Sequence, residues 1–196
     1  MREVVLASRN PKKLAELQDL LGALGYRLRP VSEFSDAAAE ETAPSFVENA
    51  LLKARHAAQA SGLPALADDS GIEVDALAGA PGVHSARYAG ATASDADNNA
   101  RLLAALRDVP AHRRGARYVC VLAFLRQADD PVPVLAQGEW RGTLLTAPRG
   151  TGGFGYDPLF WVEAHGMSAA ELPAALKNRL SHRARAAAAL AHALRG

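Results

Sequence analysis

Apolar residues recur along the chain in two patterns, one typical of strands and the other of helices. Short apolar and β-branched runs predict strands over residues 3–8, 26–31, 64–66, 72–74, 117–126, 132–146 and 159–162. Apolar residues three and four positions apart predict a first helix from Lys12 to Leu24, and three more helices are expected over residues 46–62, 95–108 and 181–195. Strands and helices interleave without repeats or low-complexity linkers, which predicts an α/β fold with a mixed sheet. No domain boundary is visible, so residues 1–196 are expected to form one domain.

Composition limits the partners and the compartment of this chain. The hydrophobic class makes up 49% of its 196 residues, which is enough for a sizeable core, and the net charge is +1. Coating nucleic acid or an anionic membrane requires a surplus of cations, so neither partner is expected. No apolar run approaches about 18 residues, and the chain opens directly into a strand, so neither a membrane span nor a signal peptide is expected. The single Cys120 lies in an expected buried strand, and we expect a reducing, cytoplasmic location.

The segment from Ser8 to Lys13 lies where the first strand meets the first helix. Asn10 can cap this helix and Pro11 can occupy its first position. Free backbone N–H groups and the positive end of the helix dipole could then bind an anion, although a plain capped turn fits the segment equally well. It is not a Walker A loop, because no Lys in the chain follows a Gly.

Two acidic pairs, Glu40-Glu41 and Asp68-Asp69, are candidates for metal binding. The first lies in residues 32–44, which lack periodicity and are expected to form a loop. The second is expected in a turn between two short strands. Mg²⁺ takes one or two carboxylates together with substrate phosphate oxygens. Solvated surface pairs are the alternative, a weaker one for Asp68-Asp69 because adjacent aspartates repel unless a cation or a donor offsets them.

A glycine cluster runs from Gly150 to Gly155 and formally matches the dinucleotide-binding pattern G-x-G-x-x-G. We reject that reading because Tyr156-Asp157-Pro158 follows and no helix is expected there to hold a pyrophosphate. The loop could present an aromatic face and a carboxylate to a nucleobase. Either ring, Phe154 or Tyr156, could equally belong to the core.

The last helix is expected to begin at Ser181, its N-cap residue, which places His182 and Arg183 in the first turn. Cations there are unfavourable for the helix dipole unless an acceptor lies nearby. A local rule that is broken in this way indicates a functional role.

Together these segments are more specific than any one of them. The motifs are Ser8-x-Asn10-x-x-Lys13, Phe46-Val-Glu-Asn-Ala-Leu-Leu-Lys53-Ala-Arg, Ala67-Asp-Asp-Ser-Gly71, Gly79-Ala-Pro-Gly82 with Ser85-Ala-Arg-Tyr88, Gly152-Gly-Phe-Gly-Tyr-Asp-Pro158 and Ser181-His-Arg183. This set, in this order, closely resembles the inosine triphosphate pyrophosphatase family, also called the Ham1 family. The motifs span about residues 6–183, nearly the whole chain.

The resemblance implies a fold, a reaction and a set of partners. The fold would be a long mixed sheet flanked by helices in two lobes, with the active site in a cleft and usually a homodimer. The reaction would be Mg²⁺-dependent hydrolysis of purine nucleotides such as ITP, dITP and XTP. Water would attack the α-phosphorus, giving the monophosphate and pyrophosphate, with positioning and electrostatics supplying most of the catalysis.

The resemblance also implies a role for each matching residue. The triphosphate would be bound by Ser8, Arg9, Asn10, Pro11, Lys12, Lys13 and Lys53. The metal would be held by Glu40 and Asp69, with Asp69 also the general base and Asp68 and Lys13 beside it in the catalytic set. Ser70 would touch the substrate. The purine would be held by Phe154, Gly155, Tyr156, Asp157, Lys177, His182 and Arg183.

Two other classes of protein remain as alternatives. A nucleotide-binding module without catalysis could dispense with Glu40, Asp68 and Asp69, so their joint presence favours an enzyme. A nucleic-acid-binding protein would interleave its basic stripe with aromatic residues, and residues 183–195 contain none. A pyrophosphatase of the Nudix kind would need an Arg-Glu-x-x-Glu-Glu core, which the sequence lacks.

Overall fold

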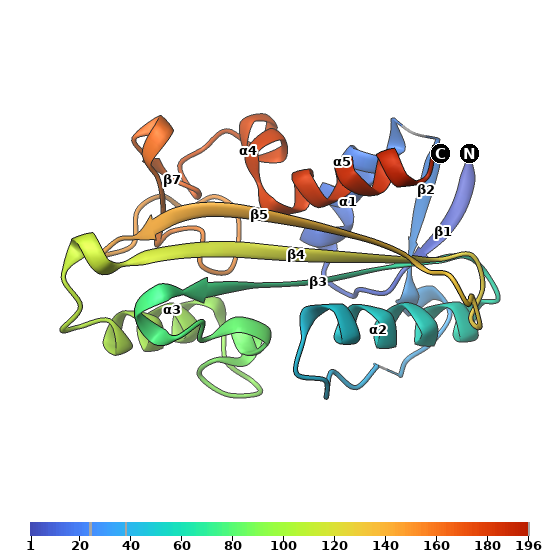
Figure 1. Cartoon of the computed structure of the whole chain (residues 1–196), viewed down its shortest axis with the longest axis horizontal. Coiled ribbons are helices and arrows are strands. Elements are labelled where there is room, and N and C mark those ends of the chain that lie inside the picture. Colours follow the sequence, from blue (N-terminus) through green and yellow to red (C-terminus); the bar gives the residue numbers. More distant parts are fainter. Residues whose placement is uncertain (24, 38, 196) are drawn as a thin grey trace. The chain divides into compact units, whose positions relative to one another are not determined.

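A computed structural model describes residues 1–23, 25–37 and 39–195 (Figure 1). Its strands are β1 (Arg2–Leu6), β2 (Tyr26–Pro30), β3 (Ala65–Val74), β4 (Gly115–Leu125), β5 (Val134–Leu144), β6 (Phe160–Val162) and β7 (Met167–Ser168). Its helices are α1 (Pro11–Gly22), α2 (Phe46–Ser61), α3 (Asp95–Ala105), α4 (Ala174–Leu180) and α5 (His182–Ala193). Leu24, expected in the first helix, lies outside the described residues, as does Ala38 of the expected loop 32–44.

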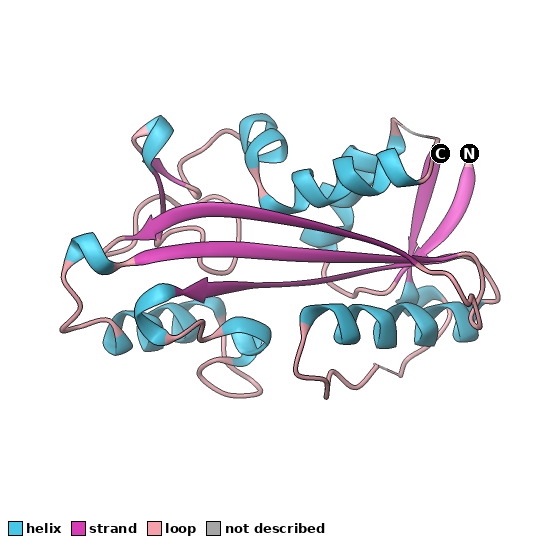
Figure 2. Cartoon of the chain, viewed as in Figure 1, coloured by secondary structure: helices cyan, strands magenta, loops and turns pink. Residues whose placement is uncertain are grey.

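The seven strands form a single mixed sheet in the order β2-β1-β3-β4-β5-β6-β7. Strands are drawn in magenta and helices in cyan in Figure 2. β1 pairs in parallel with β2 and β3, whereas β6 pairs antiparallel with β5 and β7. The α/β class expected from the sequence is confirmed. Among the described residues, no helix combines the length and the apolar character needed to cross a membrane.

The chain forms two compact units, each made of several segments. Unit 1 contains Met1–Asp69, Cys120–Gly138 and His182–Gly196, and unit 2 contains Ser70–Val119 and Glu139–Ser181. The chain passes from one unit to the other inside β3, β4 and β5, and again between α4 and α5. No linker marks these passages, which explains why the sequence shows no domain boundary.

In unit 1, alternate residues of the strands pack against different helices, as the two-residue period of a strand requires. In β4 the even-numbered residues 120–124 lie in a core cluster with Leu17 of α1 and Leu190 of α5. The odd-numbered residues 121–125 lie in another cluster, with Ala54 of α2. Figure 1 shows α1 and α5 on one side of these strands and α2 on the other. A side chain of β4 in unit 1 therefore faces either α1 and α5 or α2, according to its position along the strand.

The core of unit 2 is built around three aromatic rings. The Phe160 ring centroid lies 4.7 Å from that of Tyr118 and 5.0 Å from that of Trp140. Leu102 of α3 and Leu106, the C-cap residue of that helix, belong to the same buried cluster. Aromatic pairs at these separations add to the stability gained from buried area alone.

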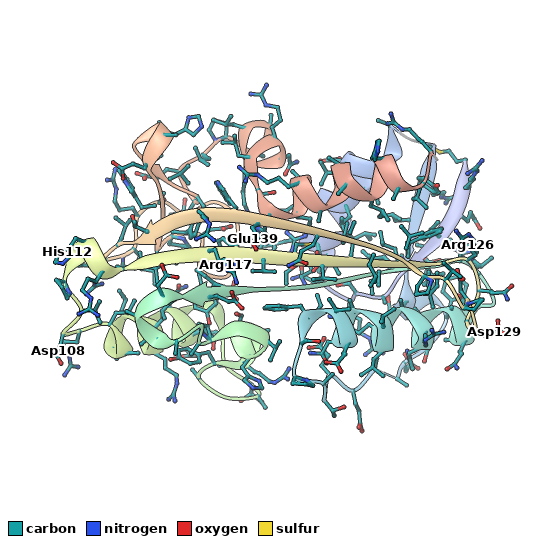
Figure 3. The ribbon with its side chains drawn as sticks, viewed as in Figure 1. Asp108, His112, Arg117, Arg126, Asp129 and Glu139 are labelled. Atoms are coloured by element: carbon teal, nitrogen blue, oxygen red, sulfur yellow. The ribbon has the colours of Figure 1, made fainter. Side chains whose placement is uncertain are left out.

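The residue before Tyr118 makes polar contacts. Arg117 of β4 donates to Glu73 of β3 at 2.7 Å and to Glu139 of β5 at 2.9 Å (Figure 3). Successive residues of a strand point to opposite faces. β4 can therefore place the Tyr118 ring in the core on one face and the ion pairs of Arg117 on the other.

The sequence prediction differs from the structure in three places. Residues 68–71 were expected to interrupt two short strands, but β3 continues through them as one strand. Two elements were not expected at all, the short strand β7 and the seven-residue helix α4. The first difference is the important one, because it fixes the directions in which Asp68 and Asp69 point.

Candidate active site

Asp68 and Asp69 lie side by side in β3, and their carboxylates contact different helices. Asp68 follows Leu66 by two positions and shares its side of the strand, where α1 and α5 pack. Asp69 contacts Lys53 of α2. The two residues therefore form two separate ion-pair centres instead of one shared carboxylate pair.

Asp68 is a fully buried anion with two cationic partners. Its carboxylate accepts from Lys13 Nζ at 2.6 Å and from Arg183 Nε at 2.7 Å, and its side chain is 0% exposed. Cys120 Sγ lies 3.4 Å from the same carboxylate. Burial alone would raise the pKa of Asp68, but Arg183 and then Lys13 hold that pKa well below its usual value. Asp68 is thus suited to orienting these two cations.

Arg183 has a second acidic partner, which explains its position in the first turn of α5. Its Nη1 lies 2.5 Å from Glu16 of α1, and its side chain is 2% exposed. The carboxylates of Asp68 and Glu16 supply the acceptors that a cation at a helix N-terminus needs. Glu16 was not expected in the site, since one acidic residue on an amphipathic helix carries no signal of its own.

The other centre joins Asp69, Lys53 and Glu41. Lys53 Nζ lies 2.5 Å from Asp69 Oδ1, 3.0 Å from Glu41 Oε1 and 2.9 Å from the carbonyl oxygen of Asp68. Burial raises the pKa of Asp69, and the nearby Lys53 opposes that rise only in part. Burial lowers the pKa of Lys53, but Asp69 and Glu41 outweigh it, so the pKa of this ammonium is raised. The centre therefore combines a stable cation with a carboxylate that accepts protons more readily than usual.

The structure brings Glu41, and not the expected Glu40, to this centre. The Glu41 side chain is 31% exposed and contacts Lys53, whereas the neighbouring Glu40 is exposed. Two adjacent acidic residues in a loop cannot be distinguished by sequence pattern, because no helical or strand period fixes which of them points inward.

The donor set fits a hard divalent cation that shares its ligands with a substrate. Two carboxylates, from Asp69 and Glu41, contact the same ammonium. Within the described parts of the chain, no three acidic, His or Cys side chains gather closely enough to hold an ion on their own. One or two carboxylates, completed by water and phosphate oxygens, is the usual arrangement for Mg²⁺.

The turn from Ser8 to Lys13 is a capped strand-to-helix turn. Asn10 Oδ1 accepts from the backbone N–H groups of Lys12 at 2.9 Å and Lys13 at 3.3 Å, and Pro11 is the first helical residue. The N–H of Asn10 donates to Ser8 Oγ at 3.2 Å. Of the two interpretations that the sequence left open, the contacts fit the plain capped turn, because side chains of the turn already accept from the N–H groups of Asn10, Lys12 and Lys13. Anion binding here would depend on side chains such as Lys12, which is exposed.

A small cavity of about 110 Å³ lies beside Lys53. Its lining includes Arg9, Glu41, Lys53 and His56, and Arg9 also donates to the carbonyl oxygen of Ser35 at 3.1 Å. His56 was not singled out from the sequence. Its signal was its spacing, since it lies three residues after Lys53 and hence on the same face of α2.

In unit 2, Asp157 fixes the loop that carries Phe154. The buried Asp157 carboxylate accepts from Lys177 Nζ at 2.6 Å, from the Phe154 N–H at 2.9 Å and from Tyr118 Oη at 3.3 Å. A Cβ atom on Gly153, whose φ is +70°, would overlap that carboxylate. These contacts tie the loop to β4 and α4.

The two rings of this loop have different surroundings. Phe154 is half-buried, and Lys177 Nζ lies 4.9 Å from its ring centroid. Tyr156 is buried, and its hydroxyl donates to the carbonyl oxygen of Ser85 at 2.7 Å. Tyr156 therefore belongs to the core, which leaves Phe154 as the ring with a partly exposed surface. No helix follows the glycine cluster in this described region, as expected.

Two further expected site residues lie at unit boundaries. Ser70 is half-buried in β3 of unit 2, and His182 is buried at the first position of α5 in unit 1. The structure thus groups Lys13, Lys53, Asp68, Asp69 and Arg183 within unit 1. It groups Phe154, Tyr156, Asp157 and Lys177 within unit 2.

The mixed sheet and the buried carboxylate–ammonium centres define an α/β protein with a candidate anion and metal site. The Ham1 family model matches residues 4–193, and the chain belongs to that family. It is 60% identical to a dITP/XTP pyrophosphatase from Methylococcus capsulatus, over 99% of this chain and 96% of that protein. It is 59% identical to a dITP/XTP pyrophosphatase from Pseudomonas aeruginosa, over 97% of this chain and 95% of that protein. The solved structure of a Ham1 protein from Coxiella burnetii matches this chain with a TM-score of 0.91 and 49% sequence identity. The match covers 100% of this chain and 99% of that chain.

Proposed function

We propose that this protein is a nucleoside triphosphate pyrophosphatase that hydrolyses dITP, ITP and XTP to the monophosphate and pyrophosphate. The observation that carries the proposal is the Asp69–Lys53–Glu41 centre, which places a basic carboxylate, a cation and a second carboxylate together. Relatives that are 59–60% identical over nearly the whole chain are named dITP/XTP pyrophosphatases, which supports the choice of substrate.

In this proposal the residues of unit 1 act on the triphosphate. Ser8, Arg9, Lys12 and Lys53 contact its oxygens, while Asn10 and Pro11 shape the turn. Lys13 is oriented by Asp68, its partner at 2.6 Å. Preorganised charges of this kind stabilise the charge that develops on the leaving pyrophosphate.

Asp69 acts as the general base. Without a bound metal, burial raises the pKa of Asp69, which suits a carboxylate that accepts a proton from water. Mg²⁺, held by Asp69 and an acidic residue of the Glu40-Glu41 pair, would neutralise phosphate charge when bound. Among the two, the contact with Lys53 favours Glu41 as the metal carboxylate.

In this proposal the residues of unit 2 hold the purine. The partly exposed Phe154 stacks on the base, and Gly155, Tyr156 and Asp157 shape its loop. Lys177 is buried beside Phe154 and Asp157, where an ammonium can donate to a purine oxygen.

Ser70, His182 and Arg183 complete the proposed substrate set, with the guanidinium of Arg183 oriented by Asp68 and Glu16. Donors aimed at the 6-position accept the keto oxygen of inosine or xanthosine and reject the 6-amino group of adenine, which would leave them unpaired. Three further statements belong to the proposal. The family resemblance implies a homodimer, the single cysteine favours a cytoplasmic location, and the near-neutral charge argues against nucleic-acid partners.

The test is a panel of nucleoside triphosphates incubated with the protein and Mg²⁺. We expect dITP, ITP and XTP to give the monophosphate and pyrophosphate, and dATP to react far more slowly. The Asp69→Asn protein, purified in the same way, controls for contaminating phosphatases. Equal rates for dITP and dATP, or activity that survives in Asp69→Asn, would overturn the proposal.

A further inference from the structure

Outside the residues already discussed, the N-terminal turn of α3 contacts the loop that carries Phe154. Asp95 and Asn99 lie one helical turn apart on α3, and both reach Gly155. The Gly155 N–H donates to Asp95 Oδ2 at 2.7 Å, and Asn99 Nδ2 donates to the Gly155 carbonyl oxygen at 2.9 Å. Both the N–H group and the carbonyl oxygen of Gly155 are therefore held by side chains of α3.

The two helix residues are also joined to each other. Asn99 Nδ2 donates to the carbonyl oxygen of Asp95 at 2.8 Å, so one amide nitrogen serves both the helix and the loop. The start of α3 is fixed by a capping box, in which Ser94 and Asp97 bond to each other's backbone N–H groups. Asp95 and Asn99 thus form a clamp on Gly155 that is built on a rigid helix. Accurate positioning of a binding group requires such a rigid support.

The clamp acts on a residue with an unusual backbone. Gly155 has a φ of +62°, a conformation in which glycine is strongly favoured, and it directly follows Phe154. Asp157 holds the other side of Phe154 by accepting from its N–H. The peptide groups on both sides of the ring are therefore fixed by side chains, one set from the loop itself and one from α3.

We propose that Asp95 and Asn99 are positioning residues for the purine-binding loop, which set the orientation of the Phe154 ring by holding Gly155. The inference rests on the proposed function, because it assumes that Phe154 stacks on the purine. A ring held in its binding orientation before the ligand arrives binds more tightly, since less conformational freedom is lost on binding. The residues act on affinity for the purine and not on the chemical step.

Neighbouring residues of α3 provide matched controls. Asp97 lies two positions after Asp95 and belongs to the capping box with Ser94. Asn98 is buried like Asn99, but its amide holds the backbone of Ala86 and Ala89, at 3.2 Å and 2.8 Å, and not the Phe154 loop. If the substitutions merely weakened α3, KM would change at all four positions. If they remove the clamp on Gly155, KM changes only at Asp95 and Asn99.

The experiment measures KM and kcat for dITP in Asp95→Ala, Asn99→Asp, Asp97→Ala and Asn98→Asp. Asp95→Ala removes a hydrogen bond to a charged group, and Asn99→Asp replaces a donor to the Gly155 carbonyl oxygen by a carboxylate that repels it. Losses of this kind correspond to roughly a tenfold change in affinity. We expect KM to rise about tenfold in the first two variants, with kcat within about threefold of wild type, and to stay near wild type in the two controls. Asp95→Asn retains an acceptor oxygen and should recover most of the affinity.

Hydrogen exchange of the peptide that contains Gly155, measured without nucleotide, reports the clamp separately from activity. We expect faster exchange in Asp95→Ala than in Asp97→Ala. Unchanged KM and exchange in Asp95→Ala, with a wild-type enzyme that hydrolyses dITP, would overturn the positioning role alone. Equal effects in the controls would overturn it too. A wild-type protein that does not hydrolyse dITP would remove the proposed function and the positioning role together.

Discussion

Arg183 and Asp68 are 115 residues apart in the chain, and their side chains form a buried ion pair in which the Nε–Oδ2 distance is 2.7 Å. The Arg183 side chain is 2% exposed and that of Asp68 is 0% exposed. The pair joins the first turn of α5 to β3 inside unit 1. It explains why a cation occupies a helix N-terminus, and it makes Asp68 part of the structural support of Lys13.

Removing Arg183 should destabilise the protein strongly. Breaking one partner of a buried pair leaves an uncompensated charge and costs about 3–5 kcal/mol. We expect Arg183→Met to lower the free energy of unfolding in urea by about that amount. Arg27→Met is the control. The Arg27 side chain is 64% exposed, with its Nη1 3.5 Å from Glu3 Oε1. Exposed ion pairs of this kind contribute about 0–1 kcal/mol to stability. Equal losses in the two variants would contradict the assignment.

The proposed role of Arg183 in base recognition makes a separate prediction. Arg183→Lys keeps a cation beside Asp68 but loses the planar guanidinium. We expect kcat/KM for dITP to fall much more than kcat/KM for dATP. The ratio of the two, which polar recognition can make as large as about 10⁴, should therefore decrease. Equal falls for the two nucleotides would assign Arg183 to the support of Asp68 alone.

Asp68 should make stability depend on pH in the acid range. Burial raises its pKa, but Arg183 and Lys13 lower it further, so the folded pKa lies below the unfolded value of about 4. Stabilisation from Asp68 is therefore fully present above about pH 4 and is lost as the pH falls through the folded pKa. Urea unfolding between pH 7 and pH 3 should show a steeper loss in wild type than in Asp68→Asn. Parallel curves would contradict this account.

The metal proposal predicts a difference between two adjacent glutamates. Activity should vanish in excess chelator and return with Mg²⁺, and Asp69→Asn should lower kcat by on the order of 10² or more. Glu41→Gln should reduce activity and weaken Mg²⁺ activation more than Glu40→Gln, because Glu41 contacts Lys53. Full activity in chelator would contradict the metal requirement, and a larger effect at Glu40 would restore the expectation from sequence.

Phe154 should contribute to the binding of every purine. Stacking depends on the face of the base and not on its edge, and it contributes about 1–3 kcal/mol. Phe154→Ala should therefore raise KM for dITP and dATP by a similar factor, whereas Phe154→Trp should retain most of the affinity. A selective loss for dITP alone would show that the ring does not act by stacking.

Much of the fold could be predicted from the sequence, because long apolar runs and leucine periods mark their elements clearly. β4, β5, α1 and α2 lie within a few residues of their predicted bounds. β3 was wrongly divided at residues 68–71. Polar residues normally end a strand, but here Lys13, Lys53 and Arg183 neutralise the aspartates inside it. Such compensation comes from distant parts of the chain, so no local pattern reveals it.

The site was predictable as a set of residues but not as a set of contacts. The expected lysines and aspartates do meet within unit 1. Glu41 was foreseen only as one member of the Glu40-Glu41 pair, and Glu16 and His56 were not foreseen. Each depends on the direction of a loop or a helix face that only packing decides. Helix α4, which carries Lys177, also lacked a signal, since its seven residues are too few to show a period.

The central claim is that water attacks the α-phosphorus and pyrophosphate leaves in one step. Hydrolysis of dITP in water labelled with ¹⁸O tests it directly, because the oxygen of the attacking water stays on the phosphorus it attacks. We predict one labelled oxygen in dIMP and none in pyrophosphate, as measured by mass spectrometry of the products. Label in pyrophosphate would place the attack on the β-phosphorus. Label in orthophosphate, with dIDP accumulating, would place it on the γ-phosphorus, and either result would contradict the account.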